Sequence, residues 1–136
     1  MPVIEDNRGN FIKTFVYEEY LALGLPTHFV EEYYSRSIPK TLRGLHFLSP
    51  PHEYAKLVTC VFGNMKDVIL DLRVGSPFYG QVEVIEMNGS NGQVLFLPPG
   101  IAHGFLAHTE VIVWYRVTSR YAPLYSCIVK NDEPSC

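Results

Sequence analysis

The stretch YAKLVTCVFGNMKDVILDLRV, residues 54–74, decides the fold of this chain. It contains two runs rich in valine, isoleucine and leucine, separated by Gly63 and Asn64. β-Branched and aliphatic residues favour strands, and a Gly-Asn pair between two such runs is a hairpin signal. The stretch therefore predicts two paired antiparallel strands joined by a tight turn.

The remainder of the chain follows the same pattern. Residues 81–100, QVEVIEMNGSNGQVLFLPPG, contain two Asn-Gly turns, and EVIVWYRVT (residues 110–118) predicts another strand. One short helix is predicted near YEEYLALG, residues 17–24, with Gly24 at its end. Short strands with turn signals about every ten residues are typical of sandwiches and barrels. We predict a single all-β domain over residues 1–136 with few short helices.

Composition excludes several classes of protein. The 136 residues are 47% hydrophobic, which suits one folded core and argues against disorder. A net charge of -3 without a basic run argues against a nucleic-acid partner. The apolar runs are too short to span a membrane, and the N-terminus does not resemble a signal peptide. Cys60, Cys127 and Cys136 lack metal-type spacing and are interpreted as free thiols, so we expect a cytoplasmic protein.

Charged residues interrupt the apolar pattern of TLRGLHFLSPPHEYAKLV, residues 41–58. Burying an unpaired charge is costly. Side chains alternate along a strand, so Lys56 points with Tyr54 and Val58. By the same rule Tyr115 points with the neighbouring valines of its strand, and Asp67 points with Asp71. Lys56, Tyr115 and one or both aspartates are therefore expected in the interior of one barrel.

Two alternatives stay open for these residues. Arg43 and His46 lie three positions apart, so they reach one cavity only if Gly44 forms a bulge or His46 lies past the strand end. Each residue also has a structural interpretation by itself. Lys56 can pair with an aspartate, Tyr115 can bond a backbone carbonyl, and His52 can be a solvated loop residue. Their concentration on neighbouring strands favours a functional site.

The segment LPPGIAHGF, residues 97–105, contains Pro-x-Gly-x-x-His, the second half of a cupin motif. In metal-binding cupins an earlier His-x-His pair supplies further ligands. Here the early histidines, His46 and His52, are six residues apart and lack a carboxylate at matching spacing. A metal site needs three or four convergent ligands. We therefore expect no metal and no cofactor.

Several short motifs occur together in one order: EDNRGNF, SRS, TLRGLHF, AKLV, GNMKDVILDLRVGSPFYG, LPPGIAHGF, WYRVTSRYAP and KNDEP. With them the chain closely resembles the dTDP-4-dehydrorhamnose 3,5-epimerase family over roughly residues 5–134. This is a metal-free cupin family of nucleotide-sugar enzymes. The resemblance implies a cupin-type jelly-roll barrel, and an enzyme that epimerises a 4-keto-6-deoxy sugar at C3, C5 or both.

The resemblance also implies roles for single residues. His46 matches the family's base, Lys56 the group that stabilises the enolate, and Tyr115 the proton donor. Asp67 matches an acidic residue beside the site. Substrate-binding positions are matched by Arg43, His103, Tyr121, which stacks on the nucleobase, and Arg8 and Phe11, whose strand reaches the neighbouring subunit of a homodimer. Glu31 and Tyr33 stand where the family has a glutamine and an asparagine that contact the base and the sugar.

Two departures from the family carry expectations of their own. The family's C-terminal aspartate, which orients the base, has no match before the sequence ends at NDEPSC, and Asp132 is not that residue. His46 is therefore expected to have a different partner or a weaker one. An ionised Glu31 only accepts hydrogen bonds, which favours the paired donors of guanine and hence a GDP sugar. A 3,4-ketoisomerase of the same fold and a non-catalytic protein that binds sugar nucleotides are the rival functions.

Overall fold

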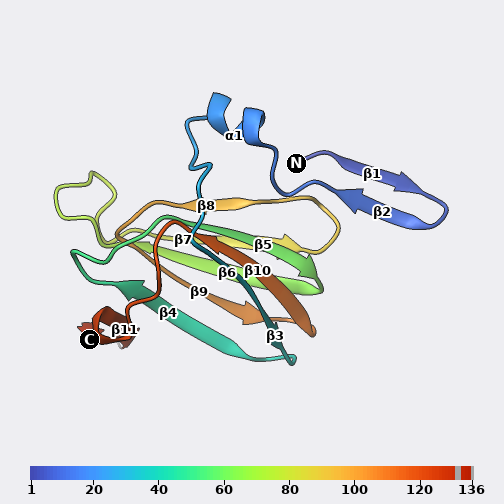
Figure 1. Ribbon diagram of the computed structural model, residues 1–136. Coiled ribbons are helices and arrows are strands. Elements are labelled where there is room, and N and C mark those ends of the chain that lie inside the picture. The colour runs from blue at the N-terminus through green and yellow to red at the C-terminus, as the bar shows by residue number, and fades with distance from the viewer. Residues whose placement is uncertain (131–132, 136) are drawn as a thin grey trace.

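The computed structural model describes residues 1–130 and 133–135. Its two larger antiparallel sheets pack face to face (Figure 1). The four-stranded sheet has the order β3 (Glu31–Ser37), β10 (Val111–Val117), β5 (Lys56–Phe62), β8 (Leu95–Leu97). The six-stranded sheet has the order β12 (Glu133–Ser135), β11 (Ser126–Lys130), β4 (Leu42–Leu48), β9 (Ile101–Ala107), β6 (Asn64–Asp71), β7 (Val82–Asn88). The predicted all-β barrel fold is confirmed.

The core lies between the two sheets. Val58 and Val113 come from the four-stranded sheet, and Met65 and Phe105 come from the six-stranded sheet. All four side chains are almost fully buried and belong to one hydrophobic cluster. Burial of apolar surface between the inner faces holds the sheets together, as in other two-layer β folds.

The predicted hairpin at Gly63 is wrong. β5 pairs with β10 and β8, whereas β6 pairs with β9 and β7, so the turn carries the chain from one sheet to the other. Residue composition predicts strands but does not identify their partners, because pairing between distant segments decides the sheet. β7 and β8 likewise belong to different sheets.

The N-terminal segment lies outside the two-sheet body. β1 (Val3–Asp6) and β2 (Gly9–Ile12) form a hairpin that projects away from the barrel (Figure 1). The predicted helix is α1 (Tyr17–Ala22), and Gly24 follows it with a φ of 69°. Tyr20 anchors this helix because its ring is buried and its hydroxyl donates to the Thr14 carbonyl at 2.6 Å. A single 3-10 turn, η1 (Pro123–Tyr125), precedes β11.

A β-bulge at Gly44 brings Arg43 and His46 to the same side of β4. The register with β9 shifts from Arg43 opposite Phe105 to His46 opposite His103. Gly44 has a φ of 104°, and a Cβ there would lie 2.6 Å from the Cα of Gly104. Only glycine therefore fits this position. The bulge is the condition under which Arg43 and His46 were expected to share a cavity.

The cysteines only partly match the expectation of free thiols. Cys60 is a buried free thiol, but Cys127 is disulfide-bonded, which corrects the prediction for Cys127. Cys136 and Asp132 lie outside the described residues. Within the described ranges, no helix combines the length and the apolar character that a membrane crossing requires.

Candidate active site

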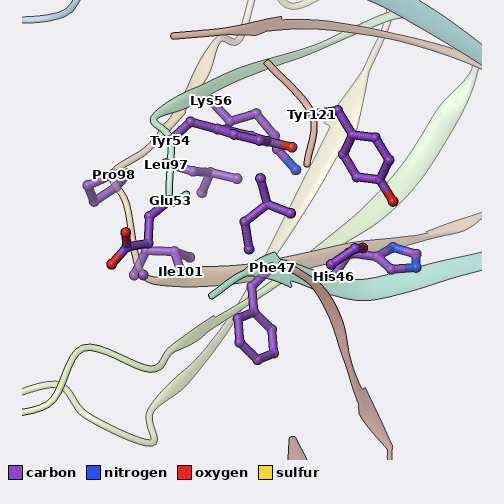
Figure 2. A pocket seen from close by; sticks show the side chains of 12 residues that line it. His46, Phe47, Glu53, Tyr54, Lys56, Leu97, Pro98, Ile101 and Tyr121 are labelled. Carbon is purple, nitrogen blue, oxygen red and sulfur yellow. The ribbon is translucent and has the colours of Figure 1, made fainter. Parts of the chain in front are cut away.

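A cavity of about 540 Å³ opens between the two sheets. Six of the residues predicted for the site line it: Arg43, His46, Lys56, His103, Tyr115 and Tyr121. A smaller recess continues from it and shares His46, Lys56 and Tyr121 with it. Figure 2 shows this recess, with the Lys56 ammonium pointing into the space near Tyr54 and Tyr121.

Lys56 brings an ammonium group into the cavity, which Arg43 also lines. Among the described residues it has no carboxylate within 4.0 Å, because Asp67 contacts His103 and Asp71 contacts Arg73. The interpretation of Lys56 as half of a structural ion pair is therefore wrong. Desolvation lowers the pKa of Lys56 to about 8, although the charge of Asp67 acts in the opposite direction. Such an ammonium is available to stabilise negative charge that forms on a bound molecule.

His46 lies at the open side of the cavity, opposite His103 in the strand register. Desolvation lowers its pKa below the ordinary value, and the nearby charges of Lys56, His103 and Arg43 lower it further. The imidazole is therefore neutral near pH 7 and able to accept a proton. Among the described residues no hydrogen bond involves its ring.

A buried carboxylate partner belongs to the other histidine of the pair. His103 Nε2 lies 2.7 Å from Asp67 Oδ2, and the side chains are 4% and 0% exposed. Desolvation lowers the pKa of His103, and the contact with Asp67 opposes this effect. Asp67 does not line the cavity; it lies behind His103 and fixes the orientation of its ring.

Tyr115 supplies a phenol on the wall formed by β10. Its side chain is buried, and desolvation raises its pKa to about 12. The hydroxyl therefore stays protonated at neutral pH and can donate a proton or a hydrogen bond. Ser35 Oγ lies beside it and acts to lower that pKa, although this oxygen has no hydrogen-bond partner of standard geometry among the described residues.

Of the remaining residues predicted to bind substrate, some line the cavity and others lie away from it. Arg43 lines the cavity, and its Nε donates to Ser37 Oγ at 2.8 Å. Glu31 is half-buried at the start of β3 and shares the face of Tyr33, but it does not line the cavity. Arg8 and Phe11 lie on the projecting β1–β2 hairpin, away from the cavity of their own chain.

Several cavity residues were absent from the predicted site, among them Ser35 and Tyr54. For Tyr54 a signal existed, because it lies two residues before Lys56 on the same face. Tyr33 and Ser35 reach the cavity because β3 pairs with β10, where Tyr33 lies opposite Tyr115. That pairing joins segments about 80 residues apart, and no local pattern reveals it.

This arrangement suits proton transfer at carbon. A neutral imidazole, an unpaired ammonium and a protonated phenol surround one cavity. They can act as base, enolate stabiliser and acid. Within the described part of the chain, no group of three or more His, Cys, Asp or Glu residues is placed to hold a metal ion.

Comparison with known proteins identifies the family. The chain matches the family described as dTDP-4-dehydrorhamnose 3,5-epimerase over residues 1–136. It is 38% identical to the dTDP-4-dehydrorhamnose 3,5-epimerase of Methanothermobacter thermautotrophicus, over 97% of this chain and 71% of that protein.

Two solved structures are similar in fold. The Legionella pneumophila 3,5-epimerase in complex with dTDP-4-keto-L-rhamnose superposes with a TM-score of 0.89 at 33% identity, covering 96% of this chain and 70% of that one. A 3'-monoepimerase from Streptomyces bikiniensis in complex with dTDP-quinovose gives 0.87 at 30% identity, covering 96% and 67%. With its matched sequence, its fold and its cavity residues, the chain belongs to the dTDP-4-dehydrorhamnose 3,5-epimerase family.

Proposed function

We propose that this protein epimerises a nucleoside-diphosphate 4-keto-6-deoxy sugar at C3, C5 or both. The observation that carries the proposal is the placement of His46, Lys56 and Tyr115 around one cavity, with the Lys56 ammonium free of any described carboxylate partner. The relatives reported above are named as epimerases, which favours this reaction over 3,4-ketoisomerisation.

The chemistry follows from the ketone at C4 of the sugar. The ketone acidifies the hydrogens on C3 and C5, and neutral His46 removes one of them as a proton. The electrons move onto the C4 oxygen to give an enolate, which the Lys56 ammonium stabilises. Tyr115 then donates its phenolic proton to the carbon from the opposite face, which inverts that centre. Exchange with solvent returns a proton to Tyr115 and removes one from His46.

Deuterium exchange tests the base. In deuterated water the enzyme should incorporate deuterium at C3 or C5 of a 4-keto-6-deoxy sugar nucleotide, as measured by NMR. His46→Asn should abolish this exchange while the midpoint of thermal unfolding stays unchanged. His52→Asn is the matched control, because His52 is an exposed loop residue whose ring centroid lies 4.0 Å from that of Tyr125, and it should exchange like the wild type. Exchange that survives His46→Asn would exclude this residue as the base.

The nucleotide of the substrate is a separate part of the proposal. The similar structures from Legionella and Streptomyces hold dTDP sugars. Glu31, by contrast, offers only acceptors if ionised and suits the adjacent donors of guanine. Calorimetric titration with GDP, CDP, UDP and dTDP should give the tightest binding for GDP if Glu31 contacts the base. Tightest binding of dTDP, with no effect of Glu31→Gln, would exclude that contact.

The assembly and location remain proposals as well. We propose a homodimer in which the β1–β2 hairpin carries Arg8 and Phe11 to the cavity of the neighbouring subunit. The exposed position of both residues on a projecting hairpin supports this assembly. A cytoplasmic location stays a prediction from the sequence.

A further inference from the structure

Tyr33 is packed against the proposed proton donor. It lies directly opposite Tyr115 in the β3–β10 register, so both side chains point to the same face of the sheet. The two ring centroids are 5.0 Å apart with an interplanar angle of 23°, which is a stacked arrangement. A stack of this kind restricts the rotation of the Tyr115 ring and hence the position of its hydroxyl.

Tyr33 also lines the cavity together with Tyr54, which lies in the loop before β5. The interaction between the Tyr33 and Tyr54 phenols raises the pKa of Tyr54 and opposes the effect of desolvation on the pKa of Tyr33. Tyr33 therefore links Tyr54, two residues before Lys56, to Tyr115 on another strand.

The Lys56 ammonium lies between the two linked rings. Its Nζ is 5.7 Å from the Tyr54 ring centroid and 5.9 Å from the Tyr115 ring centroid. The faces of aromatic rings attract a cation at such distances. Figure 2 shows Tyr54 beside the Lys56 amine in the recess. The positions of the Tyr54 and Tyr115 rings therefore help to fix the position of Lys56 Nζ.

We propose that Tyr33 is a positioning residue that braces Tyr115 with its ring and Tyr54 with its hydroxyl, and so holds the proton donor and the Lys56 ammonium in a fixed relation across the cavity. The catalytic part of this inference rests on the proposed function. The brace itself is a property of the cavity and can be measured without turnover.

A competing role for Tyr33 is direct contact with the nucleotide. Its side chain is 41% exposed and lines the cavity, so a ligand can reach it. The two roles differ in kinetics. Loss of a ligand contact that is equally strong before and during the reaction raises KM, whereas misplacement of catalytic groups lowers kcat.

The first experiment measures turnover of the 4-keto sugar nucleotide. Tyr33→Phe removes the hydroxyl that interacts with Tyr54 but keeps the stack, and should lower kcat by no more than about threefold, the effect of one weak polar contact. Tyr54→Phe should have the same effect, and the double variant should lose no more than either single variant, because both substitutions remove the same interaction. Tyr33→Asn also removes the stack and should lower kcat roughly tenfold or more with little change in KM.

The second experiment measures Lys56 itself. Reductive methylation at a series of pH values, read by peptide mass spectrometry, gives the titration midpoint of Lys56 in each variant. The groups that surround this amine are Asp67 on β6, His46 on β4, His103 on β9, and the rings of Tyr54 and Tyr115. The Tyr33→Asn substitution replaces none of these groups. Loosening of the rings admits water, so the midpoint should rise from about 8 by about one pH unit towards the ordinary lysine value.

Tyr34→Phe is the matched control, because Tyr34 is the next residue on β3, points to the opposite face and is 70% exposed. It should leave both kcat and the Lys56 midpoint at their wild-type values. An unchanged Lys56 midpoint in Tyr33→Asn, or a raised KM with unchanged kcat, would overturn the brace. If the wild-type protein turns over no 4-keto sugar, the proposed function fails, and the methylation midpoint still decides whether the brace exists.

Discussion

The buried phenol of Tyr115 separates the two halves of the proposed reaction. Removal of a proton and its return to the same face need only His46, whereas inversion needs a donor on the other face. Tyr115→Phe deletes one hydroxyl with little change in volume. Turnover should therefore fall by roughly 10²–10⁴-fold, the usual contribution of a general acid, while deuterium still enters at the carbon. Turnover and exchange measured by NMR on the same samples would test this. Wild-type turnover would assign the acid to another group.

The titration of His46 and Lys56 predicts how activity depends on pH. The base must be neutral, so the rate should fall as the pH drops through the lowered pKa of His46. The enolate stabiliser must be charged, so the rate should also fall as the pH rises through about 8, the pKa of Lys56. A plot of kcat/KM against pH, which reports the titration of the free enzyme, should be bell-shaped. Lys56→Arg keeps the charge at all accessible pH values and should remove the alkaline decline. An alkaline decline that persists in this variant would assign it to another group.

For single residues, the alternation of side chains along a strand predicted some members of the cavity and missed others. Alternation along single strands placed Lys56 and Tyr115 inside the barrel, because that rule needs only neighbours in sequence. The stack of Tyr33 on Tyr115 depends on pairing between two strands that are far apart in the chain. The hydrogen bond between His103 and Asp67 likewise joins β9 to β6. Such contacts become visible only when the strand register is known.

Among the elements, the turn at Gly63 gives a direct test of the observed sheet order. Gly63 has a φ of 80°, and a Cβ there would collide with the Glu110 carbonyl oxygen. Gly80 has a φ of 78° but nothing within 4 Å of an added Cβ, so Gly80→Ala measures the backbone strain alone. Gly80→Ala should cost about 1–2 kcal/mol of unfolding free energy. Gly63→Ala should cost about 3 kcal/mol or more, because the collision adds to that strain. Equal losses in urea denaturation would contradict the close approach.

The same turn explains why the predicted hairpin failed while its strands were correct. β5 and β6 have the residues that strands favour, and both form. A tight turn reverses the chain equally well within one sheet or between two facing sheets. The choice depends on burial between the layers, where Val58 of β5 and Met65 of β6 join the same core. Short-range signals do not contain that information.

For the whole molecule, the projecting hairpin predicts a dimer. Ile4 and Phe11 lie opposite each other on β1 and β2 and are 61% and 57% exposed, which leaves an apolar pair in contact with water. Analytical ultracentrifugation should find a dimer for the wild-type protein. Ile4→Glu should shift it towards a monomer, because a charge replaces a buried contact. Glu5→Gln, next along β1, should stay dimeric. A monomeric wild-type protein would refute the proposed exchange of hairpins.

The overall architecture was more predictable than its details. Regular turn signals and alternating strands indicate an all-β barrel, and the motifs quoted above indicate its family. The bulge at Gly44 was anticipated only as a condition, because a glycine allows a bulge without requiring one. The pairing of β4 with β9 shows that the bulge forms, since it sets His46 opposite His103.

The contact between Gly44 and Gly104 limits how this cavity can be redesigned. An added Cβ at Gly104 would collide with the Arg43 carbonyl, and one at Gly44 would press on the backbone of Gly104. A library that randomises the wall can therefore vary Leu42 or Ile128, which line the same cavity from neighbouring strands. Diversity at either glycine would yield mostly clones in which Arg43 and His46 no longer face one substrate. The two glycines are thus fixed points around which new sugar specificities would have to be selected.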